Sequence, residues 1–190
     1  IWIAATLCIS TSFFMSWLLI GDIEVAGKAY PALWWQLATI ISCGTLAAVL
    51  IPEFTKVFTS SHSKHVHEIV TAPREGGASL TILSGMVAGY FSAFSMGPLI
   101  AGLMGASYFI SQQPDGLHQL MQVQLIPGQP LVGVGSIFAF GLVAFGFLCM
   151  GPVTIAVDSY GPVTDNAQSV FELSQIEKIP GIREKIKSQF

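Results

Sequence analysis

Three carboxylates are spaced seven residues apart in the last quarter of the chain: Asp158, Asp165 and Glu172. Seven residues of α-helix correspond to 700° of rotation, so successive carboxylates lie within about 20° of one line on a helix face. Carboxylates aligned in this way repel one another unless a cation lies between them. Hard divalent ions such as Mg²⁺ bind carboxylate oxygens together with the phosphate oxygens of a substrate. The spacing therefore points to metal-assisted chemistry on a phosphate compound.

The alternative interpretation of these carboxylates is a solvated acidic helix end without chemistry. Ionisable residues close to a membrane span are functional candidates by default, and the residues alone leave both interpretations open. The three carboxylates Asp158, Asp165 and Glu172 are called the acidic stripe below. Pro162 removes one backbone hydrogen bond, to the carbonyl of Asp158, and is expected to distort this stripe.

The elements that must position the carboxylates are membrane helices. Of the 190 residues, 52% are hydrophobic and 10% are charged, against about 25% charged residues in a soluble domain. Residues 1–21, 29–52, 76–114 and 116–157 contain no Asp, Glu, Lys or Arg. Charge-free stretches of about 20 residues or more are typical of transmembrane segments. We expect an all-α, polytopic transmembrane helix bundle.

Four spans are expected, at about 1–20, 32–51, 76–111 and 133–157, the second ending at Pro52-Glu53 and the fourth passing directly into Asp158. The charge-free run 76–114 would measure about 58 Å as one helix, so it is either one long helix or two short spans. With one crossing, the segments 52–75 and 158–190 share a side and together hold seven of the eight Lys and Arg residues. The positive-inside rule favours one crossing and places both segments in the cytoplasm.

Small residues recur every four positions in the third span, at Thr81, Gly85, Gly89, Ala93, Gly97, Ala101 and Gly105. A helix face of this kind lets another backbone approach closely, which favours tight packing in lipid. Pro98 should bend this helix near its middle.

Other candidate residues carry weaker signals. His62, His65 and His67 have a spacing conceivable for metal ligands, but a solvated cytoplasmic loop is favoured. Cys8, Cys43 and Cys149 lie far apart in apolar runs and are expected to be small buried hydrophobes. No Gly-rich run with Gly-Lys-Ser/Thr occurs, so ATP is not indicated, and no nucleic-acid partner is expected. The chain opens inside an apolar segment without Met, so we interpret it as a piece of a longer protein.

The segment around the carboxylates also resembles a known family. Residues 158–167 read Asp-Ser-Tyr-Gly-Pro-Val-Thr-Asp-Asn-Ala, preceded by Phe-Gly-Phe-Leu-Cys-Met-Gly-Pro-Val-Thr-Ile-Ala-Val. This run closely resembles a signature helix of the membrane-bound, ion-translocating pyrophosphatases. Residues 53–55 (Glu-Phe-Thr) and 74–78 (Arg-Glu-Gly-Gly-Ala) match in order and spacing, so the resemblance covers nearly the whole chain.

The resemblance implies a sixteen-helix protein, usually a homodimer, that couples hydrolysis of Mg²⁺–pyrophosphate to the pumping of H⁺ or Na⁺. It assigns Asp165 to holding the Mg²⁺–pyrophosphate complex and the attacking water, Asp158 to the same metal and catalytic centre, and Asn166 to substrate binding. Mg²⁺ is the implied cofactor, and a requirement for K⁺ is left open. The implied location is the lipid bilayer of a prokaryotic inner membrane, with the site on its cytoplasmic side.

The sequence departs from the family pattern in two respects. Residues 168–171 read Gln-Ser-Val-Phe where Gly-Gly-Ile-Ala is familiar, which resembles a prokaryotic branch. Several Asp- and Lys-bearing segments of the family's site do not occur in this sequence, so the chain by itself is expected to be inactive. A secondary transporter or a structural membrane module without hydrolytic activity are the alternatives.

Overall fold

The computed structural model describes residues 1–25, 27–121 and 134–182, and nearly all of them are helical. The described helices are α1 (Trp2–Ile20), α2 (Leu33–Thr59), α3 (Lys64–Ser111), α4 (Leu117–Met121), α5 (Val134–Cys149) and α6 (Gly151–Glu177). Between α1 and α2, the two-residue strands β1 (Glu24–Val25) and β2 (Lys28–Ala29) pair antiparallel. The chain divides into two compact units, Ile1–Met150 and Gly151–Phe190, and each is described by itself.

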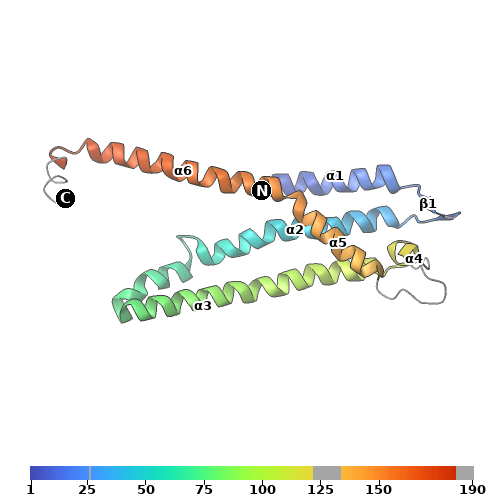
Figure 1. Ribbon diagram of the computed structural model, residues 1–190, viewed down its shortest axis with the longest axis horizontal. Helices are drawn as coiled ribbons and strands as arrows, with labels where there is room; N and C mark the ends of the chain where they lie inside the picture. Colours follow the sequence, from blue (N-terminus) through green and yellow to red (C-terminus); the bar gives the residue numbers. More distant parts are fainter. Residues whose placement is uncertain (26, 122–133, 183–190) are drawn as a thin grey trace. The chain divides into compact units, whose positions relative to one another are not determined.

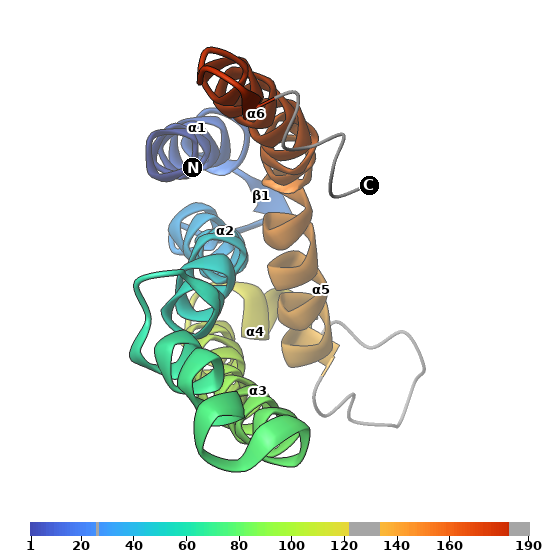
Figure 2. The ribbon, with the colours of Figure 1, turned by 90° about the vertical axis from the view of Figure 1, so that its left-hand side faces the viewer.

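Helix α2 is the centre of the first unit. It packs against α1, α3 and α5, and Figure 2 shows it between α1 and α3, with α5 alongside. Figure 1 shows α3 returning along α2 in the opposite direction. Ala38, Ile40 and Val49 on α2 are completely buried. Because α2 has neighbours on several sides, its small and apolar residues form a large part of the core of this unit.

The tightest helix contact joins α2 to α5 through glycines. A methyl group on Gly44 would collide with the carbonyl oxygen of Val143, and one on Gly146 would collide with the carbonyl oxygen of Ile41. The hydroxyl of Thr45 donates to the carbonyl oxygen of Gly146 at 3.3 Å. Close backbone approach through small residues is the usual means of helix association where lipid removes the hydrophobic drive.

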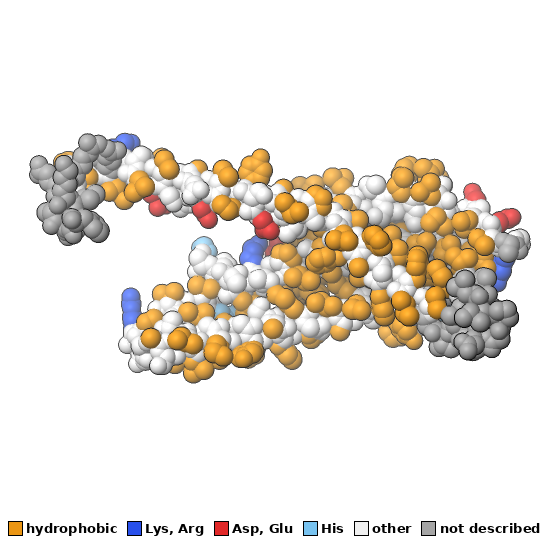
Figure 3. Space-filling view, in the orientation of Figure 1, with side chains coloured by type: hydrophobic (Ala, Val, Ile, Leu, Met, Phe, Trp, Pro, Cys, Tyr) orange, Lys and Arg blue, Asp and Glu red, His pale blue; other side chains and the backbone are white. Residues whose placement is uncertain are grey.

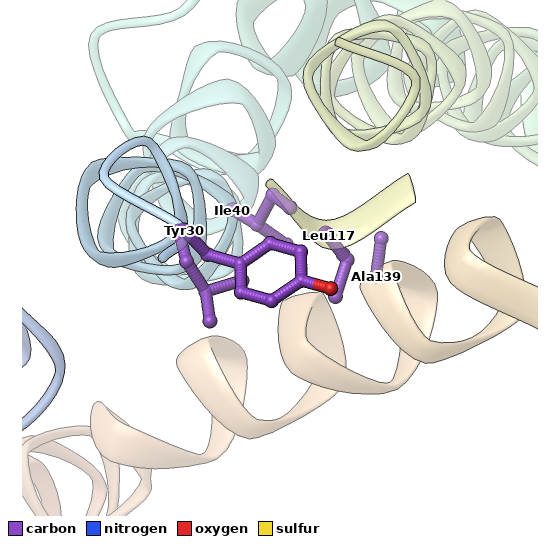
Figure 4. Close-up of a cluster of buried hydrophobic side chains, with 5 residues drawn as sticks. Tyr30, Ile40, Leu117 and Ala139 are labelled. Carbon is purple, nitrogen blue, oxygen red and sulfur yellow. The ribbon is translucent and has the colours of Figure 1, made fainter. Parts of the chain in front are cut away.

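A second contact region lies where α4 meets α2 and α5. Tyr30, Leu33, Ile40, Leu117 and Ala139 form a buried apolar cluster there, and Figure 4 shows side chains from four separate segments converging on it. The backbone N–H of Leu117 donates to Oε1 of the completely buried Gln36 at 2.8 Å. Gly116 is required beside this bond, because a methyl group there would overlap the amide of Gln36.

Helix α3 contains a sharp change of direction at two glycines. Ser63 caps its start, accepting a hydrogen bond from the N–H of His65 at 3.2 Å. Gly76 (φ −141°, ψ 17°) and Gly77 (φ 64°, ψ −154°) are not helical, and the conformation of Gly77 is essentially restricted to glycine. From residue 78 to residue 111 the helix is uninterrupted and continues through Pro98, a length of about 50 Å. The run that could have been one long helix or two is therefore one.

The predicted small-residue face of α3 is not the face that packs in this chain. Methyl groups added to Gly85, Gly89, Gly97 or Gly105 would meet nothing within 4 Å among the described atoms. The buried positions on this arm of α3 are instead Ala88, Ser107 and Ser111. Within the described residues this face has no packing partner, and tight packing on it stays a prediction, because small size permits close approach and does not select the partner.

Two expected helix ends differ in the structure. Helix α2 continues through Pro52 to Thr59, and α3 begins at Lys64, so most of the polar stretch 54–75 is helical and not a loop. The expected helix over 133–157 is interrupted at Met150. Pro152 has no N–H to donate to the carbonyl four residues earlier, whereas proline is well accommodated in the first turn of a new helix, and α6 accordingly starts at Gly151.

The helices have the surface of a membrane protein. Among the residues that the structure describes, three helical stretches are long and apolar enough to cross a membrane: Trp2–Ile20, Leu33–Ser111 and Val134–Ile176. The second stretch contains both α2 and α3, so the number of crossings stays a prediction. Large apolar side chains face outward, such as Leu19 on α1 and Phe94 on α3, exposed by 70% and 75%. Figure 3 shows hydrophobic side chains over the visible face of the first unit, with charged side chains at its hairpin end and others toward its opposite end.

Candidate functional site

Helix α6 carries all of the predicted site residues. It begins with Gly151-Pro152 and runs without interruption through Pro162 to Glu177. Asp158, Asp165 and Asn166 are exposed. Pro162 therefore does not break the stripe, and the structure places the carboxylates on one continuous helix, as their spacing predicts.

One hydrogen bond on this face was not foreseen from the sequence. The Nε2 of Gln168 donates to Oε1 of Glu172 at 2.8 Å, across one turn of α6. Glu172 thus has a local partner, whereas no ion pair involves Asp158 or Asp165 in the part of the chain that the structure describes. The sequence contains a pattern that could have predicted this bond: the amide and the carboxylate are four residues apart, and side chains at that spacing are neighbours on a helix surface.

The donor set of α6 suits Mg²⁺ in its chemistry but does not form a cage. Exposed carboxylate oxygens are the ligands that this hard cation prefers. No group of three or more His, Cys, Asp or Glu residues within residues 1–25, 27–121 and 134–182 is placed to hold a metal ion. This arrangement fits a cation that keeps water and substrate phosphate oxygens among its ligands, as Mg²⁺ commonly does. The residues that would contribute are Asp158 and Asp165.

The histidines near the start of α3 do not converge. The ring of His65 stacks on Phe58 of α2, with centroids 4.9 Å apart, and Nδ1 of His62 lies 3.2 Å from the hydroxyl of the neighbouring Ser61. Nearby, Glu53 forms an ion pair with Lys56 at 3.2 Å. These contacts are local, so the described histidines give no support to a metal site.

The fold and the site define a class of protein: a polytopic, all-α integral membrane protein with a carboxylate-bearing helix directly after the apolar helix α5. A comparison with protein families narrows this class. Residues 1–188 match the family described as inorganic H⁺ pyrophosphatase. The chain belongs to this family.

Individual relatives carry related names. The chain is 50% identical over 190 residues to the K(+)-insensitive pyrophosphate-energized proton pump of Chlorobaculum tepidum. This match covers 100% of the chain and 23% of the relative. It is 29% identical over 146 residues to the proton pump of the same description from Chloroflexus aurantiacus, covering 76% of the chain and 17% of the relative. It is 23% identical over 181 residues to the K(+)-stimulated pyrophosphate-energized sodium pump of Thermotoga maritima, and this match covers 93% of the chain and 21% of the relative.

The chain thus spans between 17% and 23% of the length of these relatives. No solved structure matches it significantly. Both proton and sodium pumps, and both K⁺-insensitive and K⁺-stimulated proteins, occur among the relatives.

Proposed function

We propose that this chain is part of a membrane pump that hydrolyses inorganic pyrophosphate and couples the reaction to the movement of H⁺ or Na⁺. The observation that carries the proposal is the match of residues 1–188 to the pyrophosphatase family, together with three aligned carboxylates on α6. The 50% identity to a protein named as a proton pump favours H⁺ as the ion. It equally favours activity that is insensitive to K⁺.

Asp165 is the central residue of the proposed site. Its carboxylate would hold the Mg²⁺–pyrophosphate complex and accept a hydrogen bond from the attacking water, orienting it toward phosphorus. Mg²⁺, when bound, would neutralise charge on the phosphate oxygens and on the leaving phosphate. Asp158, two turns earlier on the same face, would contribute oxygen ligands to the same centre. Asn166 can donate its amide N–H to a phosphate oxygen.

The proposed location is a prokaryotic inner membrane, with α6 at the cytoplasmic side and the full-length protein acting as a homodimer. The basic residues of 52–75 and 158–190 support this orientation through the positive-inside rule. The alternative functions are those of a secondary transporter and of a structural membrane module. The family match favours the hydrolytic pump over both.

Phosphate release tests the hydrolytic half of the proposal. The full-length protein in sealed vesicles should release phosphate from pyrophosphate when Mg²⁺ is present. Chelation of Mg²⁺ with EDTA should stop release, and added Mg²⁺ should restore it, because the anionic carboxylates cannot neutralise the negative charge of the phosphate groups without a bound cation. Equal rates with and without Mg²⁺ would contradict the proposed chemistry.

Single-cysteine labelling tests the proposed orientation. In a background without the natural cysteines, Ser61→Cys and Ser174→Cys should react with a membrane-impermeant reagent from the cytoplasmic face. Gln119→Cys should react from the opposite face, because one crossing by α3 separates it from Ser61. Ser61 and Ser174 lie at exposed positions, so access does not limit the measurement. Labelling of Ser61→Cys and Ser174→Cys from opposite faces would refute the four-span arrangement.

A further inference from the structure

Aromatic side chains lie at one level near the hairpin end of the first unit. Trp17 is in the last turn of α1, Trp34 and Trp35 are in the first turn of α2, and Tyr108 is in the last turn of α3. These three helix ends meet (Figure 1), because each contributes a side chain to the apolar cluster around Leu117. Tryptophan and tyrosine at one level of a membrane bundle are typical of the boundary between hydrocarbon and lipid headgroups. We call these four side chains the aromatic belt.

The thickness of a bilayer predicts where the opposite boundary lies. The hydrocarbon core measures about 30 Å, or about 20 residues of helix. On α2, the first charged residue after Trp34 is Glu53, 19 residues further along. On α3, Tyr90 lies 18 residues before Tyr108, and its side chain is 68% exposed. Both separations correspond to about 27–29 Å of helix, so the second boundary is expected near Glu53 and Tyr90.

Ionisable side chains packed beside α3 give the same boundary independently. The two-glycine corner folds the first arm of this helix, residues 64–75, back alongside the second arm (Figure 1). His65 and Glu68 of the first arm line a cavity of about 180 Å³, and the other lining residues lie within 80–88 of the second arm. A charged side chain in hydrocarbon is strongly unfavourable. The first arm therefore lies outside the hydrocarbon, and so does the stretch 80–88 beside it.

We propose that the hydrocarbon of the membrane ends on α3 at Tyr90, and that the lipid headgroups contact Tyr90 at this boundary and the aromatic belt at the other. Residues 78–89 then stand outside the lipid core, although they are free of charge and continue the same helix. The membrane-crossing part of α3 begins at about residue 90 and not at 76, and the helix projects about 18 Å beyond the hydrocarbon. The proposal does not rest on the proposed hydrolytic function.

Two spin labels on α3 of the full-length protein in liposomes test the proposal. Ile82→Cys and Ile100→Cys, in the background without natural cysteines, are a matched pair on one helix, and both positions are exposed. Molecular oxygen concentrates in hydrocarbon, whereas a water-soluble nickel chelate is excluded from it. The label at position 100 should collide mainly with oxygen, and the label at position 82 mainly with the chelate. An equal preference for oxygen at both positions would overturn the proposal, because a run lying wholly in lipid gives that result.

A structure of the full-length protein in lipid nanodiscs gives a second, direct measurement. It locates the edge of the lipid band even where other segments of the full-length protein cover position 82 and exclude both collision partners. The edge on the side of the two-glycine corner should cross α3 within one turn of Tyr90, and the opposite edge should lie at the aromatic belt. An edge more than one turn from Tyr90 in either direction would refute the proposed boundary.

Discussion

Asp165→Asn in the full-length protein should abolish pyrophosphate hydrolysis and ion pumping together. The substitution keeps the size of the side chain and its capacity for hydrogen bonds but removes the negative charge that a hard cation requires. Loss of a group that positions the attacking water reduces rates by about a hundredfold or more. Because the Asp165 side chain is exposed on α6, the variant should still fold and insert. Phosphate release and ion uptake by vesicles, normalised to the amount of protein, measure the effect.

Glu172→Gln is the matched control for this prediction. Glu172 lies seven residues further along the same helix face and already has a local partner in Gln168, at 2.8 Å. Its neutralisation should reduce hydrolysis far less than that of Asp165. Equal losses in the two variants would indicate that the stripe acts only through its total charge, and a nearly normal rate in Asp165→Asn would show that the active site has been misplaced.

Gly146→Ala should destabilise the crossing of α2 and α5 strongly. The added methyl group would collide with the carbonyl oxygen of Ile41, and the Cα of Gly44 is 3.2 Å from its position. Because backbone atoms cannot move aside as a flexible side chain can, the helices must separate. Overpacking of this kind costs about 1–3 kcal/mol, and separation would also weaken the bond from Thr45 to the Gly146 carbonyl, now 3.3 Å.

Gly141→Ala is the corresponding control on the same helix. A methyl group at Gly141 meets nothing within 4 Å among the described atoms, and alanine favours helix over glycine. The unfolding temperature of the full-length protein should fall for Gly146→Ala and stay the same or rise for Gly141→Ala. A drop of equal size in both variants would contradict the close approach of α2 and α5 at Gly146.

The sequence was most informative where a single local pattern determines the result. Absence of charge over long stretches predicted apolar helices, and seven-residue spacing predicted carboxylates on one line of α6. The first feature follows from the cost of burying charge in lipid and the second from helix geometry, so neither required knowledge of neighbouring segments. The signature run around Asp165 predicted the family for the same reason, since its order of residues is contained in one helix.

Packing partners were not predictable in the same way. The regular small-residue pattern of α3 predicted a face suited to tight packing, yet the tight contact seen in this chain uses Gly44 and Gly146, which are 102 positions apart in sequence. Which face of a helix is covered depends on the neighbours that reach it, and a local pattern does not encode them. The bond between Gln36 and Leu117 has the same origin, because it joins residues 81 positions apart.

Prolines gave two opposite errors. Pro52 was expected to end a helix that in fact continues to Thr59. At Pro152 the helix was expected to continue, but it breaks at Met150, two residues earlier. Proline removes one hydrogen bond at either place, and the surrounding contacts decide whether the helix absorbs the loss. The arrangement of Gly151 and Pro152 favours a new helix start, and this start places the acidic stripe on a separate helix, α6.

Simultaneous measurement of phosphate release and ion movement tests the central claim most directly. Sealed vesicles containing the full-length protein, with its cytoplasmic side outward, are given Mg²⁺ and pyrophosphate, and interior pH and interior Na⁺ are followed together with phosphate. We expect interior acidification or Na⁺ accumulation that begins with hydrolysis and is absent in Asp165→Asn. A protonophore should collapse the proton gradient while phosphate release continues. Hydrolysis without uptake of either ion, or uptake of either ion without hydrolysis, would contradict a pyrophosphate-driven pump.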